Sequence, residues 1–125
     1  MSRILLDTHV FIWWVEADSR VVAEWIEPIV DANNEVYVSA VTAWEIETKK
    51  QIGKLVFNHD VVAKMREFEF LGLPISLDHA GAAGALDWAH RDPFDRILVA
   101  QASTELMVLL SADAAMKSAP GVRVL

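Results

Sequence analysis

The chain has 125 residues, of which 54% are hydrophobic, and its formal net charge is −7 at pH 7. This length suits a single domain, residues 1–125, with a buried core, and the absence of cysteine excludes disulfides and Cys-based zinc sites. The negative charge counts against a protein that coats nucleic acid through a basic surface, although it does not exclude a nuclease whose own site is acidic.

Short apolar runs alternate with helical patterns along the whole chain. In chain order the patterns predict a strand at 3–6, helices at 8–16 and 19–32, a strand at 35–39, helices at 42–52 and 60–71, a strand at 73–77, helices at 79–89 and 92–105, a strand at 107–110, a helical turn at 113–117 and a strand at 122–125. This alternation favours an α/β fold in which helices cover both faces of a parallel sheet.

Neither targeting nor membrane insertion is indicated. The N-terminus has no basic region followed by a long apolar one, so we expect no signal peptide. No apolar run approaches the roughly 18 residues that a membrane span requires. We therefore expect a protein of the reducing cytoplasm with no membrane partner.

Four acidic residues lie close to the ends of predicted elements. Asp7 follows the first strand, Glu45 lies in the first turn of a helix, Asp95 opens the long apolar helix, and Asp113 follows the strand at 107–110. Ligand sites in parallel sheets form at the carboxyl ends of the strands, so we expect these carboxylates to converge. Converging carboxylates repel one another unless a cation lies between them, and their oxygens suit Mg²⁺ and Mn²⁺. The sequence therefore predicts a divalent-metal site with all four acids as ligands.

Helix capping is the alternative interpretation of these positions. Thr42 and Glu45 match a capping box. Asp92 stands where an N-cap precedes a helix-starting proline. Asp7 and Asp113 also stand where an N-cap is expected, so no single acid proves a metal site.

The neighbours of the acids need separate roles. Asp92 and Asp95 are three residues apart and share a helix face, so either could be a ligand. We favour Asp95, because an N-cap such as Asp92 is committed to its own backbone and is then structural or orients a ligand. His9 and His90 flank the acidic motifs but lack the paired spacing of a zinc site, which favours structural roles for both.

The segments that carry the acids resemble those of a known family. They are Leu6–His9, Ser39–Ile46, His90–Ala102 and Ser111–Asp113, in this order. They resemble PIN-domain ribonucleases, specifically the VapC-like toxins of bacterial type II toxin–antitoxin modules, and the resemblance spans the chain. It implies a three-layer α/β/α sandwich with a central parallel sheet, an endoribonuclease that depends on Mg²⁺ or Mn²⁺, a cognate antitoxin that blocks the site, and a homodimer.

The resemblance also suggests roles for individual residues. The four acids take the family's acidic positions, with Asp7 and Asp95 as the surest ligands. Thr8 matches a polar position that orients Asp7 or a bound water, and Ser111 keeps the hydroxyl of a position where the family often has Thr. Arg96 adjoins Asp95 and is a candidate contact to RNA phosphate, with a salt bridge to a neighbouring acid as the alternative.

The expected reaction is in-line attack on an RNA phosphodiester by a water molecule that one or two metal ions activate. A phosphoryl-transfer enzyme with Asp7 as nucleophile is a rival, but haloacid-dehalogenase-like phosphatases have a second Asp where this chain has His9. A receiver-like domain is a second rival, although the order of its motifs fits poorly. A catalytically inactive PIN fold that only binds partners is a third, and such a fold would be expected to lose one of the four acids.

Aromatic and basic residues near the motifs have two interpretations each. An exposed groove for an antitoxin helix is one interpretation of the aromatics, and core packing, favoured for at least two of them, is the other. These aromatics are Phe11, Trp13, Trp14 and Trp25. For the lysines that follow Glu45, a solvated helix face is favoured over an RNA track. These lysines are Lys49, Lys50 and Lys54.

Overall fold

The computed structural model describes residues 1–125 and contains four strands and seven helices. The strands are β1 (Arg3–Leu6), β2 (Glu35–Ser39), β3 (Leu71–Leu73) and β4 (Val108–Leu110). The helices are α1 (Thr8–Val15), α2 (Ala23–Val30), α3 (Ala40–Gln51), α4 (Val61–Glu67), α5 (Leu77–Ala85), α6 (Pro93–Thr104) and α7 (Ala114–Lys117). None of the helices combines the length and hydropathy that crossing a bilayer requires.

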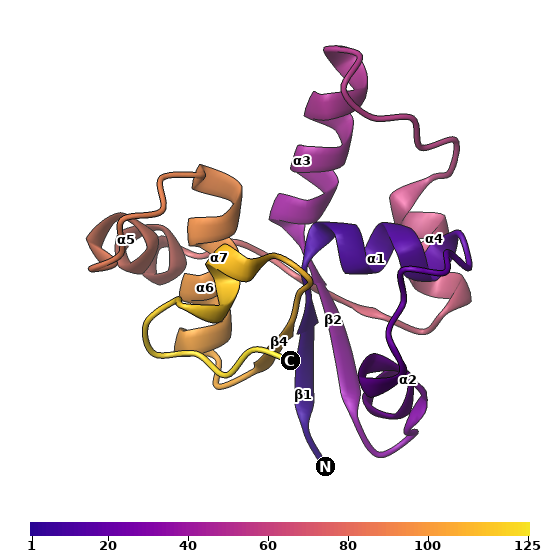
Figure 1. The fold of residues 1–125 in the computed structure, drawn as a ribbon, viewed down its shortest axis with the longest axis horizontal. Helices are drawn as coiled ribbons and strands as arrows, with labels where there is room; N and C mark the ends of the chain where they lie inside the picture. The colour runs from indigo at the N-terminus through magenta and orange to yellow at the C-terminus, as the bar shows by residue number, and fades with distance from the viewer.

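The four strands form one parallel sheet in the order β3-β2-β1-β4 (Figure 1). β1 lies between β2 and β4, and Leu5 is in register with Tyr37 on one side and Leu109 on the other. Because parallel strands end at the same edge of a sheet, the residues that follow β1 and β4 meet there. Asp7 and Ser111 are the first residues beyond these two strands.

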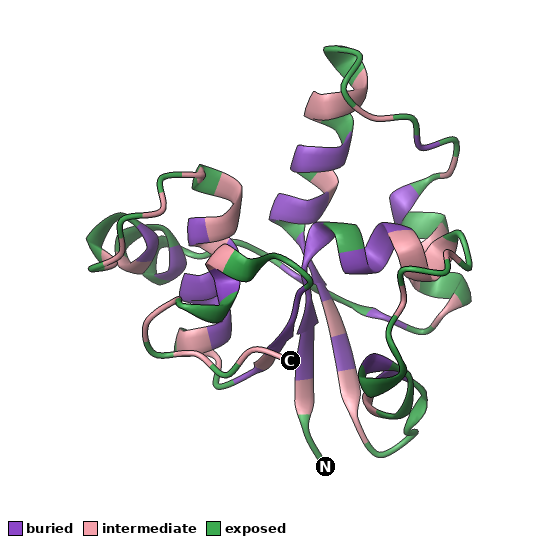
Figure 2. Ribbon diagram, in the orientation of Figure 1, coloured by how far each residue is buried: buried purple, intermediate pink, exposed green.

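Successive side chains of β1 enter two different cores, as the two-residue period of a strand requires. Ile4 and Leu6 pack in a cluster with Phe11 of α1, whereas Leu5 packs with Leu98 of α6. Figure 1 shows α1, α2 and α4 on one side of the strands and α5, α6 and α7 on the other, and Figure 2 shows the buried residues concentrated between these layers. The predicted three-layer α/β/α sandwich with a central parallel sheet is confirmed.

Several element boundaries differ from the prediction. α3 begins at Ala40 rather than Thr42, because Ser39 at the end of β2 caps the helix by accepting a hydrogen bond from the backbone of Val41 at 3.0 Å. The capping box predicted for Glu45 is therefore wrong. The strand predicted at 73–77 lies at 71–73, and Pro74, which has no N–H for a ladder hydrogen bond, follows it directly.

The C-terminal segment and α5 also differ. Residues 122–125 form only an isolated bridge, between Val124 and Leu109, instead of a strand. α5 begins at Leu77, and a capping box between Ser76 and His79 fixes its first turn. The helix pattern of the sequence extended past Ala85, but the chain leaves the helix there.

The aromatic residues of the N-terminal half divide into two groups. Phe11 and Trp25 are buried in the core, and the indole N–H of Trp25 donates to the backbone oxygen of Leu125 at 3.2 Å. Core packing is thus confirmed for these two. Trp13 and Trp14 are half-buried; Trp14 lines an apolar groove between α1, α2 and α4 with a volume of about 500 Å³.

Candidate active site

A cavity of about 400 Å³ opens where β1 and β4 end. Its acidic lining residues are Asp7, Glu45, Asp92, Asp95 and Asp113. The remaining lining residues are His9, Trp13, Arg20, Lys49 and Ala112. The four acids predicted as ligands therefore line one cavity, together with Asp92. Of the four, Asp95 and Asp113 place carboxylate oxygens in a compact group with His90, whereas Asp7 and Glu45 lie outside that group.

Asp7 is held at both carboxylate oxygens. It is the N-cap of α1, so Oδ1 accepts from the backbone N–H of Thr8 at 2.7 Å. Oδ2 accepts from the hydroxyl of Ser111 at 2.6 Å, and the residue is 6% exposed. Burial raises the pKa of Asp7 above its usual value, although the hydrogen bonds from Ser111 and Thr8 oppose that shift. The negative charge of Glu45 adds to the increase in this pKa.

Asp95 lies in the first turn of α6 and is held less completely. Asp92 caps the helix as predicted, since its Oδ1 accepts from the backbone N–H of Asp95 at 3.1 Å. Oδ2 of Asp95 lies 2.7 Å from Nε2 of His90. Burial raises the pKa of Asp95 to about 6 against the effect of the His90 hydrogen bond, and the charges of Asp7 and Asp92 raise it further. Asp7 and Asp95 thus repel each other electrostatically across the cavity.

Glu45 reaches the cavity from α3 and is 4% exposed. The hydroxyl of Thr8 donates to its Oε1 at 2.6 Å, and Nζ of Lys49, one helical turn later, donates to its Oε2 at 2.5 Å. Thr8 therefore contacts two of the acids, Asp7 through its backbone and Glu45 through its side chain. Partial burial lowers the pKa of Lys49, but its bond to Glu45 and the surrounding carboxylates leave that pKa above its usual value. The solvated face predicted for Lys49 is wrong, because its ammonium lies at the cavity.

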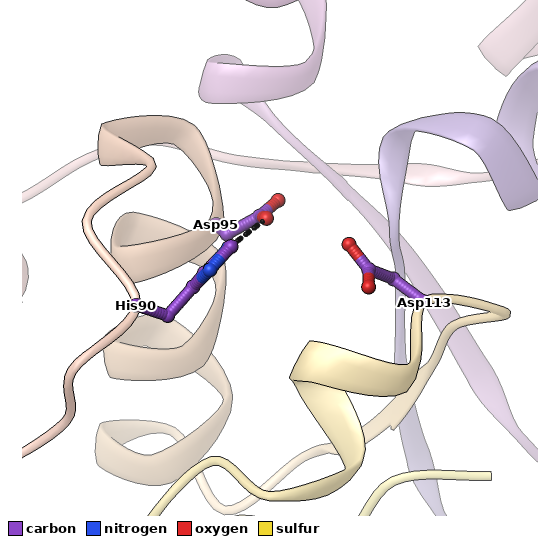
Figure 3. Close-up of side chains that lie close together, drawn as sticks. All are labelled: His90, Asp95 and Asp113. Atoms are coloured by element: carbon purple, nitrogen blue, oxygen red, sulfur yellow. Dashed lines mark hydrogen bonds and ion pairs between the residues drawn. The ribbon is translucent and has the colours of Figure 1, made fainter.

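Asp113 is the exposed member of the set. Its Oδ1 caps α7 by accepting from the backbone of Ala115 at 2.9 Å, and its own N–H donates to Oγ of Ser111 at 3.1 Å. Figure 3 shows its carboxylate directed toward His90 and Asp95, and ligand atoms of these three residues lie within 4.8 Å of one another. His90 thus bonds to one acid and also stands where a metal ligand could.

Arg96 does not face the cavity, and the predicted phosphate contact is wrong. The residue is 8% exposed, and its guanidinium donates to backbone oxygens in the last turn of α5 and in the connection from α5 to α6. These oxygens belong to Ala83 at 3.0 Å, to Leu86, Trp88 and His90 at 2.9 Å, and to Gly84 at 3.5 Å. The alternative salt bridge does not form either. Arg96 instead fixes the connection that brings His90 to Asp95.

Two cavity residues carried no signal in the motifs. Trp13 is one turn beyond His9 on α1, and Arg20 lies in the connection between α1 and α2. The only local hint for Arg20 is Asp18 two residues earlier, with which it pairs. Lys49 did have a signal, because a Glu and a Lys four residues apart on a helix are expected to pair.

The PIN domain family profile matches residues 4–122. The chain belongs to the PIN domain family. This confirms the resemblance predicted from the four acid-bearing segments, and membership of the family implies nuclease activity in general terms. Among curated protein sequences, none matches this PIN domain at a significant level.

Solved structures with a similar fold cover nearly the whole chain. A chain of VapBC2 from Rickettsia felis bound to a DNA fragment from their promoter has 14% identity and a TM-score of 0.73, with 98% of this chain and 97% of that chain covered. A chain of DNA-bound VapBC from Salmonella typhimurium has 16% identity and a TM-score of 0.73, with 100% and 98% covered. A toxin–antitoxin complex from Klebsiella pneumoniae has 20% identity and a TM-score of 0.67, with 98% and 95% covered. At these identities the likeness establishes a shared fold.

Proposed function

We propose that this PIN domain is an endoribonuclease that depends on Mg²⁺ or Mn²⁺ and acts as the toxin of a type II toxin–antitoxin module. The observation that carries the proposal is the convergence of four carboxylates, from four separate elements, on one cavity. Burial and mutual repulsion raise the pKa values of Asp7 and Asp95 there. Carboxylates that repel one another without a cation are stabilised when a divalent cation binds between them.

The donor set fits a hard divalent cation. Asp95 and Asp113 would hold it with carboxylate oxygens and His90 with a nitrogen, and Asp7 lines the same cavity as a further carboxylate. When bound, Mg²⁺ or Mn²⁺ lowers the pKa of a coordinated water and polarises a phosphoryl oxygen. The absence of cysteine removes the thiolates that would favour a structural zinc site.

The chain's own residues supply orientation and proton transfer. Ser111 and Thr8 fix the carboxylate of Asp7, and both oxygens of Glu45 are engaged by Thr8 and Lys49. Asp113 is exposed, and capping engages only its Oδ1. Oδ2 of Asp113 accepts no hydrogen bond within the fold, so Asp113 can hold the ion or accept the proton of the attacking water.

Direct attack on phosphate by an aspartate fits the geometry poorly. Asp7 is 6% exposed and both of its oxygens accept hydrogen bonds inside the fold, so a phosphorus atom with its substituents has poorer in-line access to this carboxylate than a small cation has. This favours hydrolysis over a phosphoryl-transfer enzyme or a receiver-like domain. An antitoxin as partner is supported by the solved complexes of similar fold, two of which are VapBC bound to DNA. A homodimer remains part of the proposal on the resemblance alone.

The test is a cleavage assay on purified protein with a single-stranded RNA, the same sequence as DNA, and Mg²⁺ or Mn²⁺. We expect cleavage of the RNA that EDTA stops and that Asp7→Asn and Asp95→Asn each reduce more than about 100-fold, because even partners of metal ligands contribute roughly 10- to 100-fold. The matched control is Asp60→Asn, which replaces an N-cap on α4 outside the cavity. Circular dichroism establishes that each variant is folded.

Two outcomes would contradict the proposal. Metal-dependent cleavage retained in both folded variants would remove Asp7 and Asp95 from the site. Wild-type protein that binds Mn²⁺ yet cleaves no RNA would favour the inactive interaction module. For the toxin role, growth arrest on expression in bacteria should disappear with Asp7→Asn and with co-expression of the protein encoded by an adjoining reading frame.

A further inference from the structure

The acidic cavity contains two cationic side chains, and they differ in what they contact. Lys49 extends its ammonium to Glu45, so its charge neutralises a carboxylate of the site itself. Arg20 contacts none of the four acids, and 63% of its side chain is exposed. Its ion-pair partner, Asp18, does not line the cavity, and Lys49 is only 30% exposed, so Arg20 is the cation of the cavity that is more accessible to a molecule from solution.

Arg20 is nevertheless held in one orientation. Its Nε lies 3.0 Å from Oδ1 of Asp18 and its Nη2 lies 2.7 Å from Oδ2, in a two-pronged pair, while its backbone N–H also donates to Oδ1 at 2.8 Å. The guanidinium carbon lies 4.7 Å from the ring centroid of Trp13. These contacts occupy the Nε and Nη2 side of the group and leave Nη1 unengaged. An exposed pair of this kind adds little to stability, so its main effect is to preset the guanidinium.

Trp13 is itself fixed on α1. It stacks on the buried Trp25 with ring centroids 6.3 Å apart and an angle of 19° between the planes. His9, one turn earlier, has its ring 5.9 Å from that of Trp13 and also lines the cavity. His9, Trp13 and Arg20 together form what we term the α1 wall. In Figure 1, α1 leaves the strand ends on the side away from α6, which carries Asp95.

We propose that Arg20, supported by Trp13, binds a phosphate of the RNA strand next to the one that is cleaved. The inference rests on the proposed nuclease function and names the contact by which the same site holds its substrate. The chain has a net charge of −7, so it lacks the general basic surface that holds a polyanion. A preset guanidinium binds a phosphate with charge-assisted hydrogen bonds that a flexible lysine supplies less well. Because Arg20 touches none of the acids, it contributes to substrate binding rather than to the chemical step.

The test uses a short single-stranded RNA and the variants Arg20→Ala, Arg20→Lys and Arg66→Ala. Arg66 is an exposed arginine on α4, outside the cavity, and is the matched control. For Arg20→Ala we expect KM to rise about 10-fold or more with kcat within about twofold, since a hydrogen bond to a charged group contributes roughly that factor. The slope of log binding constant against log salt concentration should fall by about 0.7, the value for one lost contact to a single strand. Arg20→Lys should retain most of that slope and part of the affinity.

A second arm locates the contact and separates it from the chemistry. RNAs with a single uncharged methylphosphonate are bound in the presence of Ca²⁺ and measured by fluorescence anisotropy. A methylphosphonate at one position next to the cleaved bond should lower the RNA affinity of wild-type protein as much as Arg20→Ala does. The same methylphosphonate should not lower the RNA affinity of Arg20→Ala further. If wild-type protein cleaves no RNA, the nuclease proposal fails, and the scan of methylphosphonate positions still shows whether Arg20 binds a phosphate, because such a position weakens wild-type binding and leaves Arg20→Ala binding unchanged. Unchanged binding and salt slope in Arg20→Ala would overturn the inference and leave a protein carboxylate as the more suitable ligand.

Discussion

Asp7 and Asp95 face the same cavity but are held by different parts of the molecule. Asp7 follows the central strand, and both of its oxygens accept hydrogen bonds from residues at the strand ends, Thr8 and Ser111. Asp95 stands at the start of α6, and its side chain contacts His90 from an irregular connection. The first carboxylate is fixed by the sheet itself, and the second by a loop that needs its own support.

That support comes from Arg96. Its guanidinium binds backbone oxygens in the last turn of α5 and in the connection from Leu86 to His90, where the N–H of Trp88 donates to the oxygen of Leu86. Arg96 thus has a structural role, because the position of His90 and Asp95 on the α6 side of the cavity depends on it. The half of the site around Asp7 should therefore be robust to local change, and the half around Asp95 sensitive to it.

The largest expected effect is that of Arg96→Ala. The substitution leaves the buried carbonyl oxygen of Ala83 and the part-buried ones of Leu86 and Trp88 without donors, so we expect the free energy of unfolding to fall by about 3 kcal/mol, measured by urea denaturation. Hydrogen exchange should accelerate more in α5, whose last turn Arg96 binds, than in α1. Arg96→Lys should not restore stability, because an ammonium cannot reach several carbonyls at once.

The control for Arg96→Ala is Arg66→Ala, which removes an exposed arginine and should change stability by less than about 0.5 kcal/mol. Equal acceleration of exchange in α1 and in α5 would show that the two halves of the site are not independent. The distinction between a sheet-held Asp7 and a loop-held Asp95 would then fail.

A smaller effect should distinguish the two carboxylates directly. Ser111→Ala removes the hydroxyl that Asp7 needs, and buried Asp7 has no water to replace it, so we expect Mn²⁺ affinity to fall by roughly 10- to 100-fold. His90→Ala removes the partner of the more accessible Asp95 and one candidate nitrogen ligand, and because water can take both places, it should lower the affinity by less than about 10-fold. Titration calorimetry measures both, and Ser111→Thr, which keeps the hydroxyl, should bind almost as wild type does. A larger loss of Mn²⁺ affinity in His90→Ala than in Ser111→Ala would contradict this prediction.

The sequence could predict the half of the site that depends on local pattern. An acid directly after a buried strand, as Asp7 is, and an Asp-Pro helix start, as at Asp92, follow from chain order and capping alone. The start of α3 was missed because Ser39 and Thr42 both offer a capping hydroxyl, and the end of β2 at Ser39 decides between them.

Long-range contacts explain what the sequence could not predict. The oxygens of Glu45 are engaged by Lys49 on the same helix and by Thr8, which lies 37 residues away. The role of Arg96 depends on carbonyls of a connection whose path no periodicity specifies. Arg20 lies at the cavity because the connection after α1 places its guanidinium over Trp13 of that helix. Side chains that act through tertiary partners leave no pattern along the chain.

The smallest expected effect is a pH dependence that comes from Asp95. The folded protein holds the pKa of this carboxyl at about 6, above its ordinary value, so between about pH 4 and pH 6 the folded state binds a proton more tightly than the unfolded chain does. Without metal, the contribution of Asp95 to stability is therefore greatest below about pH 4 and is lost as the pH rises through 6. Asp95→Asn stays neutral, so in EDTA it should melt a few degrees above wild type at pH 7, and the difference should shrink toward pH 4.

Metal binding should follow the opposite trend, because a ligand must lose its proton to bind. Added Mn²⁺ should raise the melting temperature of wild type at pH 7 and do so much less at pH 5, and it should have little effect on Asp95→Asn at either pH. Asp60→Asn, outside the cavity, should behave as wild type does throughout. If Asp95→Asn were less stable than wild type at pH 7 in EDTA, its ionised carboxylate would carry no penalty in the fold. The ionised carboxylate of Asp95 would then be no less stable than one at an ordinary helix start. The raised pKa of Asp7 would remain as the electrostatic support for a cation between Asp95 and Asp7.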